Sequence, residues 1–157
     1  MASGMTKLVD TLTAREAGLA EMRQLLEEER ESMLAFDTER LQAAAARKVE
    51  LAGRMEELDS ACRTLLNQEG AGTVSALLAR GASPEGGQLA TLQARLTGLA
   101  EEVRGMMADN RRLLESSLAM IGRSLAFFQS RFTVAETYGH SGQMVERAGS
   151  GLLRKEL

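Results

Sequence analysis

Residues 89–132 decide the fold class, and they read LATLQARLTGLAEEVRGMMADNRRLLESSLAMIGRSLAFFQSRF. Apolar residues recur every three or four positions along this stretch, which is the spacing that lines one face of an α-helix. No proline interrupts it, and residues of high helix propensity such as Leu, Ala, Met, Glu and Arg are abundant. The stretch therefore predicts one long helix over residues 89–132.

A second apolar stripe lies beside the first and becomes the more apolar of the two after Asn110. It comprises Met107, Leu114, Leu118, Ile121, Leu125, Phe128 and Phe132. The combined apolar surface is wider than one partner helix would cover. Two interpretations stay open: a further layer of packing within the chain, or a groove that accepts an amphipathic helix of another protein.

Asn110 is a polar residue within the first stripe, between Met106 and Leu113. A buried Asn costs stability, but it can fix the register of packed helices. We therefore expect Asn110 to have a structural role in setting that register.

Residues 6–67 show the same helical spacing in two consecutive runs. The first run is Leu8, Leu12, Arg15, Leu19, Met22, Leu26, Glu29, Met33 and Phe36, and the second is Leu41, Ala44, Lys48, Leu51, Met55, Leu58, Cys62 and Leu65. The pattern slips near Asp37, where neither Gly nor Pro occurs, so we interpret the slip as a stutter in one continuous helix. We expect the helix over residues 6–67 to pack with the helix over 89–132 as a long antiparallel, coiled-coil-like hairpin.

The connection and the C-terminal tail are rich in glycine. Residues 68–88 hold a short predicted helix over 73–80, with Thr73 as N-cap and Gly81 as its stop. Residues 133–157 contain four glycines and short apolar pairs, which predicts a flexible or weakly helical tail. The sequence thus predicts a single all-α domain over residues 1–157, whose tail residues Met144, Leu152 and Leu153 are available to contact a partner.

The composition argues against several classes of function. The net charge is −3 and acidic and basic residues alternate, so no basic stripe indicates nucleic-acid binding. One Cys and one His cannot form an internal disulfide or a protein zinc site, and this cysteine content fits a reducing cytoplasm. The N-terminus has no apolar signal region, and no apolar run approaches the roughly 18 residues of a membrane helix.

Catalytic chemistry is also not indicated by the sequence. No nucleophile elbow, Walker loop, dinucleotide fingerprint or metal-ligand spacing occurs. His140 lies among glycines without a carboxylate to orient it, and Cys62 lies between Leu58 and Leu65 as a small buried apolar residue. We therefore expect no enzyme activity, no catalytic or metal-binding residue and no cofactor.

Two stretches resemble the FlgN-type flagellar export chaperones. Residues 36–66, FDTERLQAAAARKVELAGRMEELDSACRTLL, resemble the first long helix of that family. Residues 110–128, NRRLLESSLAMIGRSLAFF, followed by TYGHSG at 137–142, resemble its second long helix and its closing Tyr-Gly-x-x-Gly. The resemblance spans about residues 8–142. It departs from the family pattern at Arg111, where Gly often follows the Asn, and in the glycine-rich middle loop.

The resemblance implies a cytoplasmic type III export chaperone. Such a protein binds the C-terminal helical segments of the hook-associated proteins FlgK and FlgL, prevents their premature assembly and delivers them to the export gate. It also implies that Tyr138 and Gly139 dock on the gate protein FlhA. The expected cargo-binding residues are Met107, Leu114, Leu118, Ile121, Leu125, Phe128, Phe132, Met144, Leu152 and Leu153. The alternative is a structural coiled-coil scaffold or homodimer without cargo, in which the same surface is buried between two copies.

Overall fold

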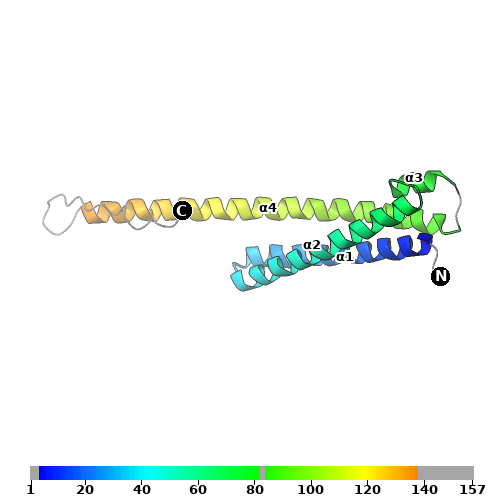
Figure 1. The fold of residues 1–157 in the computed structure, drawn as a ribbon. Coiled ribbons are helices and arrows are strands. Elements are labelled where there is room, and N and C mark those ends of the chain that lie inside the picture. Colours follow the sequence, from blue (N-terminus) through cyan, green and yellow to red (C-terminus); the bar gives the residue numbers. More distant parts are fainter. Residues whose placement is uncertain (1–3, 82–83, 138–157) are drawn as a thin grey trace. The chain divides into compact units, whose positions relative to one another are not determined.

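The computed structural model describes residues 4–81 and 84–137, which form four helices (Figure 1). These are α1 (Gly4–Leu34), α2 (Thr38–Gln68), α3 (Val74–Ala79) and α4 (Gly86–Thr137), and no described residue lies in a strand. The predicted all-α class is confirmed, including a helical hairpin and a short middle helix. The chain divides into two compact units, Met1–Arg112 and Leu113–Leu157, and α4 contributes residues to both.

The prediction of one continuous helix over residues 6–67 is wrong, because the chain reverses at Ala35, Phe36 and Asp37. Phe36 adopts a left-handed backbone conformation with φ of 53°, and its N–H donates to Met33 O at 3.2 Å. The Asp37 N–H donates to Ser32 O at 2.9 Å, which completes the bonding pattern that commonly ends a helix. The Asp37 side chain then accepts from Arg40 N at 3.1 Å and caps α2.

The three-residue connection makes α1 and α2 an antiparallel hairpin. Ion pairs along its length join Glu21 to Arg54 at 3.0 Å and Glu28 to Arg47 at 2.9 Å. Residue numbers fall on α2 as they rise on α1, which is the signature of antiparallel packing. Figure 1 shows the two helices side by side, with α3 near the end of the hairpin where α1 begins.

The first part of α4 packs against α1 in parallel orientation. Arg95 Nε lies 3.0 Å from Glu16 Oε1, and Arg23 Nη1 lies 3.3 Å from Glu102 Oε2, so residue numbers rise together on both helices. The antiparallel hairpin therefore lies between α1 and α2, whereas it was expected between the segments 6–67 and 89–132. The cause is the turn at Phe36, which places α4 as a third helix beside the hairpin.

The main core of the first unit forms where all four helices meet. Its buried residues are Leu8, Val9 and Leu12 of α1, Cys62 and Leu66 of α2, Val74 of α3, and Leu89, Leu92 and Leu96 of α4. Full burial of a Leu or Val side chain stabilises a fold by about 1.5–3 kcal/mol. These apolar contacts therefore fix the start of α4 against the open end of the hairpin.

The glycine-rich connection supplies the turns that this core requires. Gly70 ends α2 with φ of 69°, and its N–H donates to Asn67 O at 2.9 Å. Thr73 accepts from Ala76 N at 3.0 Å and caps α3, which confirms the predicted cap and short helix. The Arg80 side chain donates to Glu69 O at 3.1 Å and also to Gly70 O, which ties the end of α3 to the end of α2.

The C-terminal end of α4 differs from expectation in a limited way. The predicted end of the last long helix at residue 132 is five residues short, since α4 ends at Thr137. The flexible or weakly helical tail was predicted over residues 133–157. Its first five residues belong to α4, and residues 138–157 lie outside the described residues.

Three polar side chains that interrupt the apolar stripes meet at one place in the first unit. Asn110 of α4 is 5 % exposed, and its Nδ2 donates to Leu26 O at 2.8 Å and to Glu29 Oε2 at 2.9 Å. The other carboxylate oxygen, Glu29 Oε1, lies 2.6 Å from Lys48 Nζ of α2. We call Asn110, Glu29 and Lys48 the polar cluster, and it links α1, α2 and α4.

The turn at Phe36 gives the first testable prediction. A bulky residue in the left-handed region costs about 1–2 kcal/mol that glycine does not, and the Phe36 side chain is 77 % exposed, so little packing is lost on its removal. We therefore expect Phe36→Gly to raise the free energy of unfolding by about 1 kcal/mol in urea denaturation. The matched control is Phe36→Ala, which keeps a Cβ and should not gain this stability. Equal gains in both variants would contradict the explanation.

The polar cluster gives the second testable prediction. The role of Asn110 in setting the register of the helices stays a prediction. Substitution of Glu29, which it contacts, and of Lys48, which pairs with Glu29, tests it. Lys48→Met leaves the Glu29 carboxylate, only 14 % exposed, without its cation, and should lower the free energy of unfolding by roughly 1–3 kcal/mol. Adding Glu29→Gln removes the unpaired charge and should recover part of that loss, because the amide oxygen still accepts from Asn110. Additive losses in the double variant would show that the three side chains are not coupled.

Candidate functional site

The second unit presents a row of large apolar side chains on α4. We define the α4 apolar face as Leu114, Leu118, Ile121, Leu125, Phe128 and Phe132. Their spacing alternates between four and three residues, so they follow one side of the helix and match the repeat of a coiled-coil interface. Their exposed fractions run from 43 % at Leu114 to 71 % at Phe132. A continuous row of exposed large apolar side chains on one face is typical of an interaction surface.

The remaining residues predicted for cargo binding fall in two groups. Met107 belongs to the first unit, lies one heptad before Leu114 and is 48 % exposed. Met144, Leu152 and Leu153 lie outside the described residues, as do Tyr138 and Gly139. The structure therefore brings together the six residues of the α4 apolar face and gives no geometry for the tail.

Two further exposed apolar side chains widen this surface. Met120 and Phe127 are 57 % and 55 % exposed, and each precedes a residue of the α4 apolar face. The rings of Phe127 and Phe128 meet edge to face with centroids 5.9 Å apart. The Arg131 guanidinium lies 5.2 Å from the centre of the Phe127 ring, within the range of a cation–π contact. The last described turns of α4 therefore hold an aromatic pair with one cation stacked on it.

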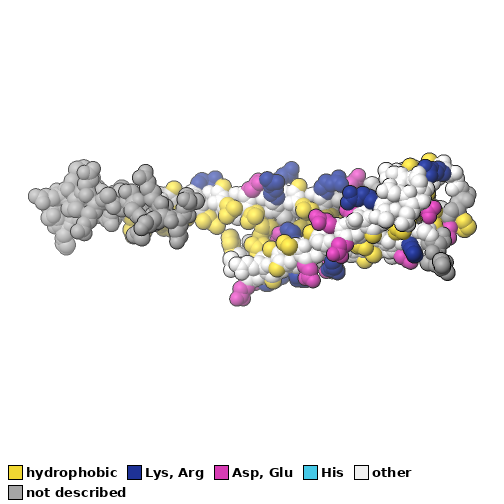
Figure 2. Space-filling model, viewed as in Figure 1, with side chains coloured by type: hydrophobic (Ala, Val, Ile, Leu, Met, Phe, Trp, Pro, Cys, Tyr) yellow, Lys and Arg dark blue, Asp and Glu magenta, His cyan; other side chains and the backbone are white. Residues whose placement is uncertain are grey.

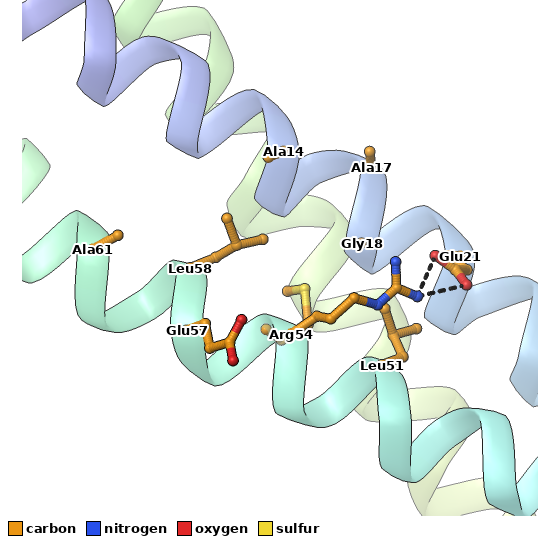
Figure 3. Close-up of a pocket in the computed structure, with 10 residues that line it drawn as sticks. Ala14, Ala17, Gly18, Glu21, Leu51, Arg54, Glu57, Leu58 and Ala61 are labelled. Atoms are coloured by element: carbon orange, nitrogen blue, oxygen red, sulfur yellow. Dashed lines mark hydrogen bonds and ion pairs between the residues drawn. The ribbon is translucent and has the colours of Figure 1, made fainter.

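A groove lies between α1 and α2 in the first unit (Figure 3). Its volume is about 530 Å³, and Ala14, Ala17, Gly18 and Ala61 are among the short residues that line it. Figure 3 shows Arg54 joined to Glu21 at its rim, where Arg54 Nη2 donates to both carboxylate oxygens at 3.0 and 3.1 Å. Among the described residues that line the groove, the one cation is thus already paired, and no nucleophile and base are brought together. The groove offers contact area rather than catalytic chemistry.

Cys62 lies in the core of the first unit and is 4 % exposed. Burial raises the pKa of its thiol, while the nearby Arg15 guanidinium lowers that pKa and the Asp59 carboxylate raises it. Arg15 Nε lies 2.8 Å from Asp59 Oδ1, so the cation is already paired with a carboxylate. The net upward shift favours the neutral thiol, which is a poor nucleophile, and this environment suits a packing role.

Charge on the described surface is mixed. Figure 2 shows basic and acidic side chains interspersed over the visible face of the α1–α2 hairpin, with no large area of one sign. The visible face of the hairpin therefore lacks the basic stripe that neutralises phosphates. Within residues 4–81 and 84–137, no three His, Cys, Asp or Glu side chains gather in a way that could hold a metal ion. None of the described helices is both long and apolar enough to pass through a membrane.

Reasoning from sequence missed two features of this structure. The first is the polar cluster, although its signal was present, since Glu29, Lys48 and Asn110 each interrupt an apolar stripe. The cluster can be predicted only if three long helices, and not two, are known to pack together. The second is the α1–α2 groove, whose signal is the short residues Ala14, Ala17 and Gly18, spaced to share one side of α1.

One comparison with known proteins gave a match, to a protein family. The model of the FlgN protein family matches residues 1–146, a range that includes every described residue of this chain. Searches of the curated proteins and of the solved structures found no match. The family match covers the polar cluster, the α4 apolar face and the position of Tyr138. The chain therefore belongs to the FlgN protein family, a family of flagellar export chaperones that are not enzymes.

Proposed function

We propose that this chain is a cytoplasmic type III export chaperone whose cargo is the C-terminal helical segments of FlgK-type and FlgL-type hook-associated proteins. Family membership supports hook-associated proteins as the class of cargo. The observation that carries the choice of surface is the α4 apolar face, where Leu118, Leu125 and Phe132 are 59 %, 58 % and 71 % exposed. These side chains need an apolar partner, and an amphipathic helix has the shape to cover them.

Hydrophobic burial supplies the binding free energy in this proposal. Removing apolar surface from water stabilises a complex by about 25 cal/mol per Å², before the cost of ordering the partner. A cargo segment that is disordered when free pays that cost on docking, so its affinity stays moderate and its release stays possible. While docked, its own apolar stripe is covered, which prevents premature self-association. The tail residues Met144, Leu152 and Leu153 add apolar contacts to the docked segment in this scheme.

Delivery to the export gate is assigned to a different part of the chain. We place docking on the gate protein FlhA at Tyr138 and Gly139, which match the closing Tyr-Gly of the family pattern. A Tyr side chain loses little entropy on binding and combines an apolar ring with a polar hydroxyl, which suits an interface anchor. The two residues follow the last helical residue, Thr137, directly. In this scheme the gate-docking residues lie between the α4 apolar face and the tail residues that contact cargo.

A cargo-free scaffold is the competing function, and light scattering separates the two. The full chain is measured alone and with a FlgK C-terminal peptide. The export chaperone predicts that the peptide forms a defined complex and displaces any self-association through the α4 apolar face. A tight dimer whose mass the peptide does not change supports the scaffold instead.

Truncation of the α4 apolar face tests cargo binding. Leu125→Ala with Phe128→Ala removes two side chains that are 58 % and 57 % exposed. Their loss should weaken peptide binding about 30-fold, from roughly 2 kcal/mol of lost apolar burial. Fluorescence anisotropy with a labelled FlgK C-terminal peptide measures the change, and circular dichroism should show nearly unchanged helicity.

The control for that variant is Val49→Ala on α2, because Val49 is an apolar side chain of the first unit that is 74 % exposed. It should leave the affinity unchanged. Two results count against the proposed surface: a loss of most helicity in the Leu125 and Phe128 variant, or equal weakening by Val49→Ala.

Tyr138→Ala tests the division of labour between cargo and gate. It should abolish most binding to the purified cytoplasmic domain of FlhA while cargo affinity stays within about twofold, because a single anchor residue often contributes about 2 kcal/mol or more at its own interface. Tyr138→Phe is the conservative control that keeps the ring. Parallel losses of gate and cargo binding would disprove the separation.

A further inference from the structure

We draw no further inference here: the strongest candidate, the exposed apolar patch that Leu34 and Phe36 form at the turn between α1 and α2, has no partner among the described residues, and nothing in the structure shows what covers it.

Discussion

The polar cluster of Asn110, Glu29 and Lys48 is the contact on which the packing of the first unit depends. Apolar contacts between helices are not directional, and a leucine surface tolerates sliding by one heptad at modest cost. Hydrogen bonds to a carboxylate that is only 14 % exposed are directional and costly to lose. Any shift of α4 along α1 would separate Asn110 from Glu29 and from Leu26 O. One residue from each of the three long helices thus meets at a single place, which favours one alignment.

The chemistry of α4 changes just after this cluster. Before it, the helix buries Leu92, Leu96 and Val103 on one side. After it, the apolar residues of the neighbouring side are the exposed ones, from Leu114 to Phe132. A single helix therefore supplies a packing surface for its own fold and a separate surface suited to a partner. This division explains why the sequence shows two adjacent stripes of unequal apolar character, and why the second stripe is not needed to complete the first unit.

The sequence was sufficient for the helical class, the cap at Thr73 and the residues of the α4 apolar face, because each depends on local spacing and propensity. It was insufficient for the turn at Phe36, since a left-handed aromatic residue contradicts the preference that normally marks a helix end. Because that turn was not predicted, the wrong helices were expected to pair, and the polar cluster between three helices was not predicted.

The three-residue connection between α1 and α2 has a consequence for how the chain is made. Contacts within the hairpin, such as Glu28 with Arg47, join residues close in sequence, whereas Arg23 and Glu102 are 79 residues apart. Loop closure costs less for near neighbours, so the hairpin can assemble while the ribosome is still translating the rest. The nascent hairpin then exposes Leu8 and Leu12 until Leu89 and Leu92 emerge to cover them. A translational pause between these segments would prolong the period in which the newborn protein is most prone to aggregate.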